Sequence, residues 1–429
     1  MTLALDPELY EPEAPAVNTV HESESVRLSH PGPATILFVD NRNWGCFFQL
    51  ESGLRRAGFR TVRVTTGAVS RSASALCFDR TLRLRSADEL ERLPEILEGE
   101  TIIDVQVTES LAVATFGALA AISDSPHRAT WARRRAAVDK LYVSDVLHRR
   151  GVHTPETVPA YLTSAEYVAD VLGLPVVHKP RRGSGGAEVS IVRTMKGLRE
   201  ILAGEGGTED YFFERFIDGD PLQFSGVISK GRALLNVTYQ TLDRRCDNGP
   251  ASMIRCIEDM PLEHTGELVA RTLGIDGMIN VNVIRDAEGR DWVHDVNPRV
   301  WGSCLAFRSA SLNFCEAYVG YLKGTAPLEP HHRAAAGSEL MVFPAALESS
   351  KIGGANGYGV LPFAKGVWPY LRWLGPRYAA YESVRHLRRV AYGLLRPDAA
   401  ESTAAEPAPI VPLSVPAAVS SVKEDLLAS

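Results

Sequence analysis

The feature that most constrains the fold is a hairpin in which amide and carboxylate side chains recur at every second residue. Asn280 and Asn282 alternate with valines in one segment, and Asp295 and Asn297 follow in the next segment, after a turn over residues 285–290. Because side chains alternate between the faces of a strand, each pair lies on one face. Pairing of the strands would gather these oxygen atoms into a set that suits Mg²⁺. The alternative is a polar end to a hairpin.

A second motif is a glycine-rich turn between two strands. The first strand ends at Lys179, and the turn Gly183-Ser184-Gly185-Gly186 follows. Glycine lets backbone N–H groups approach phosphate oxygens, and a lysine adds positive charge. Lys is scarce here, at 8 of the 46 basic residues. The pattern is neither a P-loop nor a Rossmann fingerprint, because G-x-x-x-x-G-K-[ST] is absent and a strand follows. A mobile surface hairpin is the alternative.

A third segment, Phe213-Glu214-Arg215-Phe216-Ile217-Asp218-Gly219-Asp220, is an apolar strand that breaks into acidic residues and glycine. Its backbone could lie against a nucleobase and its carboxylates against a ribose. An ordinary strand end followed by a turn explains the same pattern, so this segment alone is a weak indication.

The chain divides into several regions by composition and periodicity. Strand, helix and strand follow one another within 34–125, which predicts an α/β domain with a parallel sheet. An apolar stripe predicts one helix from Arg134 to Arg150. Residues 1–33 are an acidic arm without periodicity, and 398–429 are rich in Ala, Pro, Ser and Val, so both are expected to be disordered.

Composition excludes several classes of protein. The net charge of -6 gives no general nucleic-acid footprint. The six cysteines contain no C-x-x-C pair, so neither a disulfide framework nor a zinc site is expected. The N-terminus lacks a signal peptide and no run of ~18 apolar residues occurs, which favours a cytoplasmic protein without a transmembrane segment. Basic amphipathic helices over 361–395 could contact an anionic membrane surface, but a helical cap on the core is favoured.

In chain order, these motifs resemble the ATP-grasp superfamily, and within it the carbamoyl-phosphate-synthase-like carboxylate–amine ligases. The resemblance covers roughly residues 35–325. It implies a mixed α/β (α+β) fold, with a parallel α/β pre-ATP-grasp domain at the N-terminus. An ATP-grasp domain is expected over 126–330, with a lid subdomain at about 154–216, and a C-terminal helical extension over 331–397.

The resemblance also implies roles for single residues. Lys140 and Lys179 match the lysines that contact ATP phosphates. Arg255 matches an arginine that holds the substrate carboxylate or its phosphorylated form, and Arg299 matches the arginine that follows the metal ligands. The other ATP-binding positions are Gly183, Ser184, Gly185, Gly186, Glu214, Phe216, Ile217 and Asp220, and the metal ligands are Asn282, Asp295 and Asn297.

The sequence departs from the family pattern at the metal site. Asn282 stands where an acidic ligand is expected, and Asp295 is shorter than the usual Glu. The acid that contacts the ribose would fall near Pro221, so Asp220 or Asp218 must substitute for it. One carboxylate in place of two is expected to hold Mg²⁺ less tightly.

The resemblance implies an ATP-dependent ligase that joins a carboxylate to an amine through an acyl phosphate, on small amino-acid-like substrates. ATP and Mg²⁺, with Mn²⁺ as a substitute, are the implied cofactors. The implied partners are the two small-molecule substrates and a second copy of the chain in a homodimer, with no nucleic acid. The alternatives are an ATP-grasp kinase, a thioester-forming ligase, or a nucleotide-binding regulator with impaired catalysis.

Overall fold

The computed structural model describes residues 34–41, 44–66, 77–121, 128–161, 163–183, 186, 188–244, 251–325 and 336–342. The expected acidic arm, the amphipathic segment 361–395 and the C-terminal tail lie outside these residues, as do Ser184 and Gly185 of the glycine-rich turn. No helix in the described part of the chain is both long enough and apolar enough to cross a bilayer.

The N-terminal domain is built on a parallel sheet, as the sequence predicts. The sheet order is β3-β2-β1-β4, and every neighbouring pair is parallel. Its helices cover the sheet, whose strands are largely buried, as parallel strands usually are. The elements are β1 (Ala34–Asp40), α1 (Gly45–Arg56), β2 (Arg60–Thr66), β3 (Arg80–Leu84), η2 (Asp88–Arg92), α3 (Leu93–Ile96), β4 (Thr101–Val107) and α4 (Glu109–Ala120).

A large antiparallel sheet forms the centre of the molecule, with the order β13-β12-β9-β10-β11-β14. The expected hairpin turn at Lys230 is confirmed, because β9 and β10 pair on either side of it. The last strand, β14, lies in the segment that the sequence assigned to the C-terminal extension. The elements are β9 (Asp220–Ser229), β10 (Arg232–Arg244), β11 (Ala251–Ile257), α9 (Met260–Leu273), β12 (Gly277–Arg285), β13 (Asp291–Asn297) and β14 (Glu339–Met341).

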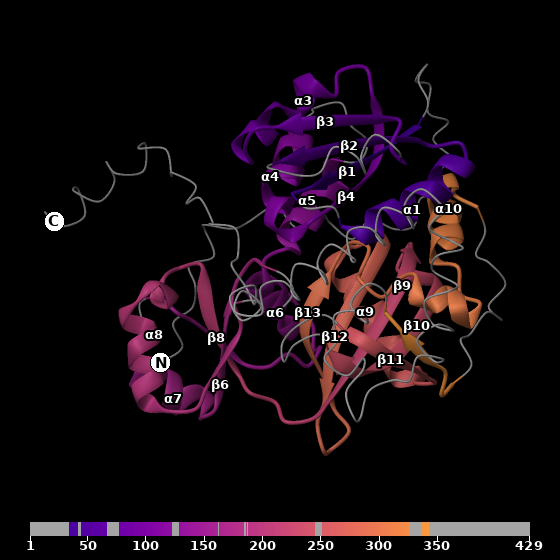
Figure 1. Cartoon of the computed structure of the whole chain (residues 1–429). Coiled ribbons are helices and arrows are strands. Elements are labelled where there is room, and N and C mark those ends of the chain that lie inside the picture. The colour runs from indigo at the N-terminus through magenta and orange to yellow at the C-terminus, as the bar shows by residue number, and fades with distance from the viewer. Residues whose placement is uncertain are drawn as a thin grey trace, which may run out of the picture.

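A smaller antiparallel sheet, with the order β5-β8-β6-β7, forms the lid. Figure 1 shows this lid beside the large sheet, with α6 near the seam and the N-terminal domain above. The glycine-rich turn connects β6 and β7. The elements are β5 (Thr157–Pro159), α7 (Ala165–Leu172), β6 (Val176–Pro180), β7 (Ser190–Val192), α8 (Met195–Ala203), η3 (Glu205–Gly207) and β8 (Tyr211–Arg215).

The helix expected from Arg134 to Arg150 is two helices, so that prediction is wrong. α5 (Arg128–Ala136) and α6 (Lys140–Arg149) are separated at Asp139. The Asp139 carboxylate accepts hydrogen bonds from the backbone N–H groups of Leu141 and Tyr142, which makes it the N-cap of α6. This break places Lys140 in the first turn of a new helix.

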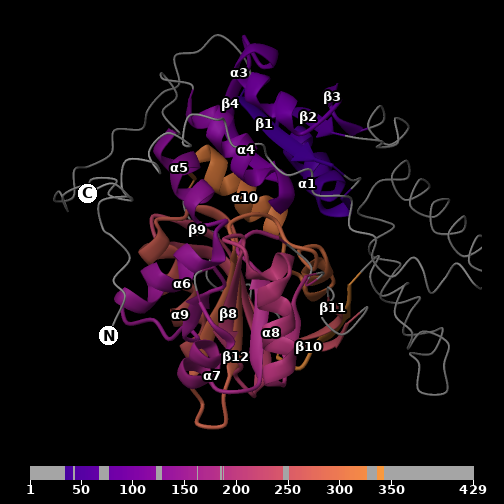
Figure 2. The ribbon, with the colours of Figure 1, turned by 90° about the vertical axis from the view of Figure 1, so that its left-hand side faces the viewer.

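The N-terminal domain and the large sheet share one hydrophobic core. Phe47 and Phe48 of α1 belong to the same buried cluster as Tyr239 of β10 and Phe314 of α10 (Phe314–Lys323). Figure 2 shows α10 between the N-terminal sheet and the large sheet. Buried polar contacts add to this core, because the Tyr318 hydroxyl of α10 donates to the Asp104 carboxylate of β4 at 2.6 Å. The two units are therefore held in a fixed relation.

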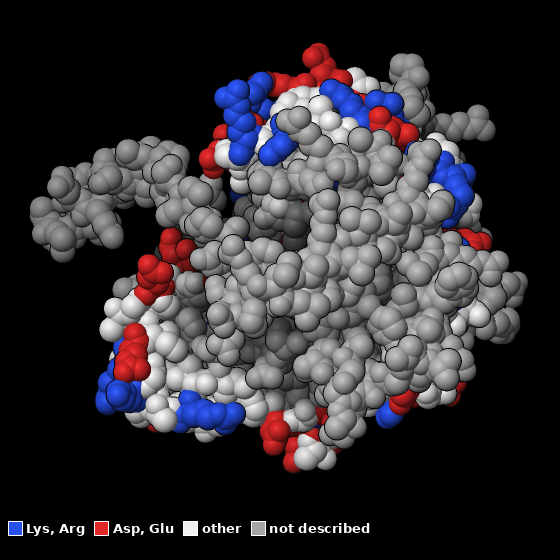
Figure 3. All heavy atoms as spheres, viewed as in Figure 1, with Lys and Arg blue, Asp and Glu red and all other residues white. Residues whose placement is uncertain are grey.

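The charged surface is mixed in sign. On the face drawn in Figure 3, basic and acidic side chains lie close together over the visible parts of the N-terminal domain and the lid. No broad patch of one sign is seen among the described atoms on that face.

The packing of α9 on the large sheet can be tested at a helical glycine. A Cβ at Gly266 would lie 2.2 Å from ring atoms of the buried Phe224, so Gly266→Ala overpacks this contact. We expect a loss of about 1–3 kcal/mol in the free energy of unfolding. Gly117→Ala in α4 is the control, because its Cβ meets nothing closer than 3.7 Å and alanine favours a helix by about 0.5–1 kcal/mol. Urea denaturation should separate the two variants; equal midpoints would contradict this packing.

Candidate active site

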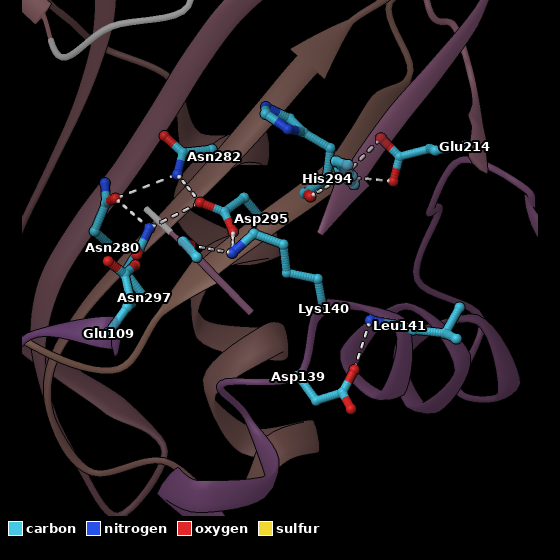
Figure 4. A network of polar contacts seen from close by, with 12 residues as sticks. Glu109, Asp139, Lys140, Leu141, Glu214, Asn280, Asn282, His294, Asp295 and Asn297 are labelled. Atoms are coloured by element: carbon cyan, nitrogen blue, oxygen red, sulfur yellow. Dashed lines mark hydrogen bonds and ion pairs between the residues drawn. The ribbon is translucent and has the colours of Figure 1, made fainter. Parts of the chain in front are cut away.

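The polar hairpin forms as its spacing predicts. Asn280 pairs with Asn297, and Asn282 pairs with Asp295, between β12 and β13. The Asp295 Oδ2 atom accepts hydrogen bonds from the amides of Asn282 at 3.2 Å and Asn297 at 3.0 Å. Both amides also donate to Asn280 Oδ1 (Figure 4). The expected metal ligands thus lie in one cluster, joined by Asn280.

Asp295 is the charged centre of this cluster. Its Oδ1 atom lies 3.1 Å from the Lys140 ammonium. Burial alone would raise the pKa of Asp295, but the charge and hydrogen bond of Lys140 and the charge of Lys179 act with other nearby groups to outweigh it, and the pKa falls to about 2. Burial alone would also lower the pKa of Lys140, but the charges of Asp295 and Glu109 outweigh that effect and raise it. Both groups are therefore ionised at neutral pH.

The donor set fits Mg²⁺. Carboxylate and amide oxygens are hard ligands, and Mg²⁺ is often held by one or two carboxylates while phosphates and water complete its shell. Among the described residues, no group of three His, Cys, Asp or Glu could hold a metal ion without help from amides. Asp295, Asn282 and Asn297 would therefore share the ion. The amides must turn their oxygens towards it, because their nitrogens point at Asp295 in the structure.

Lys140 also reaches the glycine-rich turn. Its Nζ atom donates to the backbone oxygen of Gly183 at 2.8 Å, and its backbone N–H donates to Arg181 O at 2.9 Å. The guanidinium of Arg181 in turn pairs with Asp139, the N-cap of α6. The start of α6 and the glycine-rich turn are thus tied together beside Asp295. Gly186 has φ +70°, a conformation that favours glycine.

Lys179 and Glu214 form a buried ion pair across the lid. Lys179 Nζ donates to Glu214 at 2.8 Å and to His294 O at 2.9 Å, and both residues are at most 5% exposed. Burial raises the pKa of the Glu214 carboxyl, and the ammonium of Lys179 opposes that rise. The Glu214 side chain therefore orients Lys179. Any contact of this segment with a nucleobase would come from the backbone at the half-buried Phe216 and Ile217.

Two histidines flank these motifs and differ in position. His178 stacks on Tyr211 at 4.9 Å, and its Nε2 atom lies 2.9 Å from Gly206 O, on the side of the lid away from Lys179. His294 lies inside the site (Figure 4). Burial, and then the charge of Lys179, lower the pKa of His294 to about 3, so its imidazole is neutral at neutral pH.

Arg299 lies next to the metal-ligand cluster and is held by the N-terminal domain. Its Nη2 atom donates to Asn297 Oδ1 at 2.8 Å and pairs with Glu109, at the first residue of α4. Its guanidinium also stacks on the Trp44 ring at 4.9 Å. Sequence motifs missed Glu109 and Trp44. The usable signal was their place, directly after parallel strands, where the carboxyl ends of such strands form ligand sites.

The structure does not bring Arg255 to this cluster. The neighbouring Cys256 packs with Tyr239 in the core, so Arg255 points from the opposite face of β11. The Tyr239 hydroxyl lies 3.4 Å from Asn280 Nδ2, so Tyr239 lies on the face of the large sheet that carries the expected metal ligands. Arg255 lies on the opposite face. Arg255 instead pairs with Glu339 of β14 at 2.6 Å, and its side chain is 43% exposed. Its expected contact with a substrate carboxylate is not supported by this geometry.

Asp220 is the other predicted residue outside the cluster. It is exposed at the first position of β9, opposite Arg285 of β12. This places it at the end of the hinge that follows β8. A ribose contact at Asp220 therefore remains a prediction.

Comparison with known proteins bears on the central part of the chain. A family model for the ATP-grasp domain matches residues 137–303. The D-alanine–D-alanine ligase of Synechococcus sp. (strain JA-3-3Ab) is 28% identical over 178 residues, which cover 38% of this chain and 54% of that protein. The chain thus spans about half the length of this relative.

Solved structures share the fold over a longer stretch. Carboxyaminoimidazole ribonucleotide synthase from Aspergillus clavatus, complexed with ATP, matches with a TM-score of 0.58 and 14% identity, covering 72% of this chain and 81% of that one. The biotin carboxylase domain of the Hydrogenobacter thermophilus 2-oxoglutarate carboxylase, a dimer with MgADP, matches with a TM-score of 0.55 and 16% identity, covering 70% and 72%. At this identity the likeness shows the fold.

Three observations indicate the same fold. They are the strand order of the three sheets, the oxygen ligands on the hairpin of β12 and β13, and the match to the family model. The expected mixed α/β architecture, with a parallel α/β domain before the central domain, is confirmed. Residues 137–303 form an ATP-grasp domain, as the match to the family model shows.

Proposed function

We propose that this protein is an ATP-dependent ligase that joins a carboxylate to an amine. The observation that carries the proposal is the convergence of three cations, Lys140, Lys179 and Arg299, around the oxygen ligands at Asp295. Phosphoryl transfer needs charge neutralisation and positioning more than covalent help from side chains. This set of groups supplies both.

The reaction would proceed in two steps. A carboxylate oxygen of the acid attacks the γ-phosphorus of ATP, and the bond between the γ-phosphorus and the β–γ bridging oxygen breaks. ADP is released, and the acid is now an acyl phosphate. The amine then attacks the carbonyl carbon, the bond to the phosphate oxygen breaks, and the amine loses a proton as the amide forms. Phosphate is the leaving group. No covalent bond to the protein is needed in either step.

The side chains of this chain have distinct tasks in that reaction. Lys140 and Lys179 would bind phosphate oxygens of the nucleotide. Lys140 would give up part of its contact with Asp295, and Lys179 part of its contact with His294 O. Glu214 keeps Lys179 oriented. Arg299 would face the transferred phosphoryl group. A bound Mg²⁺, held by Asp295, Asn282 and Asn297, would neutralise phosphate charge.

The described cysteines give no support for a thiol nucleophile. Cys304 follows the metal-ligand motif, but burial raises its pKa well above the ordinary value. Burial likewise raises the pKa of Cys256 and that of Cys315 to about 11. These thiols remain protonated at neutral pH, and a thiol is a poor nucleophile. A mechanism without protein-bound intermediates is therefore favoured.

The comparisons support the choice of substrates. By its name, the Synechococcus relative ligates D-alanine to D-alanine, which agrees with small amino-acid-like substrates for this chain. The biotin carboxylase neighbour is a dimer with MgADP, which agrees with Mg²⁺ use and with a homodimer here. The proposal places the enzyme in the cytoplasm, where ATP is available.

The proposal is tested by screening pairs of amino acids for ADP release. With the correct acid and Mg²⁺, hydroxylamine should replace the amine and give a hydroxamate, because it traps acyl phosphates. Arg299→Ala should abolish hydroxamate formation, whereas Arg255→Ala should retain it. ADP release with a phosphorylated alcohol as the product, and no hydroxamate, would contradict the ligase and favour the kinase alternative.

Nucleotide affinity should depend on the two buried lysines. Lys140→Ala and Lys179→Ala each remove a charge-assisted phosphate contact worth roughly 1.5–3 kcal/mol, so we expect ATP affinity to fall about 10- to 150-fold by calorimetry. Lys196→Ala is the matched control, because this lysine lies on α8 and its side chain is 86% exposed.

The Lys179 variant needs a check on folding. Lys179→Ala leaves Glu214 buried without its cation, so the free energy of unfolding should fall more than in Lys140→Ala. Circular dichroism must therefore show a folded protein before affinity is measured. Unchanged ATP affinity in both folded variants would show that the nucleotide site is elsewhere.

A further inference from the structure

We infer that the N-terminal domain acts directly in phosphoryl transfer, through Glu109 and Trp44 as positioning residues that clamp Arg299 in the ATP-grasp domain. This inference rests on the proposed function and deepens it. It gives the parallel α/β domain a part in the active site that no motif of the sequence indicates.

The clamp grips Arg299 from two sides. Glu109, the first residue of α4, pairs with the Nη2 atom, and Trp44, before α1, places its ring 4.9 Å from the guanidinium carbon. An ion pair fixes the edge of the guanidinium plane and an aromatic face fixes its tilt. Together they define an orientation that one contact alone would leave free.

The backbone beside Arg299 is held by the same domain. Val300 N–H donates to Gln106 Oε1 of β4 at 2.9 Å, and Gln106 Nε2 donates to the Tyr318 hydroxyl at 3.0 Å. Gln106 is fully buried. The loop after β13 is therefore anchored at its main chain as well as at its side chain, by residues about 190 positions earlier in the chain.

The environment of Glu109 makes this ion pair strong. The side chain is 9% exposed and that of Arg299 is 12% exposed, so solvent screens the pair little. Glu109 also lies in the first turn of α4, where the helix dipole favours a negative charge. Glu109, Lys140 and Arg299 line one cavity, which places the clamp next to the Lys140–Asp295 pair.

The clamp leaves two of the five N–H donors of Arg299 for a further acceptor. Nη1 donates one hydrogen to Val300 O at 2.8 Å, and both hydrogens of Nη2 are used by Glu109 and Asn297. The buried Nε–H has no acceptor among the described residues. A phosphoryl oxygen is the acceptor that the proposed reaction would bring to the Nε–H and the second Nη1–H.

The first test is Glu109→Gln against a matched control. Loss of the ion pair lets Arg299 move, and a displacement of about 1 Å can cost on the order of 10²-fold in rate, so we expect kcat for ADP release to fall roughly 10- to 100-fold. The KM for ATP and the ADP affinity should change much less than kcat, because Lys140 and Lys179 keep their contacts with Asp295 and Glu214. Glu109→Asp should recover part of the rate.

Glu100→Gln is the control, because Glu100 is also 9% exposed and paired with arginines, but at the other end of the N-terminal sheet. It should reduce stability without reducing kcat. Trp44→Phe keeps an aromatic face and should lose less kcat than Trp44→Leu. Equal kcat in Glu109→Gln and the wild type would overturn the positioning role.

A spectroscopic test detects the contact between Trp44 and Arg299 without relying on enzyme activity. The contribution of Trp44 to fluorescence is the difference between a protein and its Trp44→Phe variant. Arg299→Ala should change this contribution, Glu109→Gln should change it in the same direction, and Glu100→Gln should not. No change in Arg299→Ala would overturn the clamp. If no acid supports ADP release in the wild type, the ligase proposal fails, and the fluorescence result still decides the contact.

Discussion

The ion pair between Lys140 and Asp295 is the point at which three parts of the molecule meet. Lys140 begins α6, donates to Gly183 O in the glycine-rich turn and lies 3.1 Å from Asp295 on β13. The N-cap Asp139 makes this possible, because it begins α6 after α5 has ended at Ala136. The lid, the linking helix and the large sheet are thus joined at a partly buried charge pair, and the groups that we propose to bind phosphate and metal lie close together.

A single carboxylate at the proposed metal site has a physical advantage when no ion is bound. Asn282 pairs with Asp295 across the hairpin, and its amide donates to the carboxylate. A second carboxylate there would repel the first and would raise the pKa of one of them. With an amide, one positive charge, that of Lys140, is enough to balance the cluster. A site with one carboxylate attracts a divalent ion less strongly than a site with two. The phosphates of the nucleotide therefore contribute a larger share of the binding of the ion.

Sequence periodicity predicts which side chains share a face within a hairpin. It gives little information about contacts between segments that lie far apart in the chain. The shared face of Asn280 and Asn282, and that of Asp295 and Asn297, follow from alternation alone. Glu109 carries no such signal, because its partner Arg299 belongs to another domain and the contact depends on how the two units pack. Alternation puts Arg255 and Cys256 on opposite faces of β11, but only the pairing of Cys256 with Tyr239 of β10 shows which face lies with the proposed metal ligands. The break at Asp139 was hidden by an apolar stripe that continues across it.

The central claim is that Asp295 holds the metal ion that accompanies the nucleotide. Calorimetric titration of ADP, with and without Mg²⁺, on the wild type and on Asp295→Asn tests it most directly, because asparagine keeps the shape and removes the charge. The account predicts that Mg²⁺ strengthens ADP binding to the wild type and has little effect on the variant. Equal strengthening by Mg²⁺ in both proteins would contradict the assignment of this carboxylate.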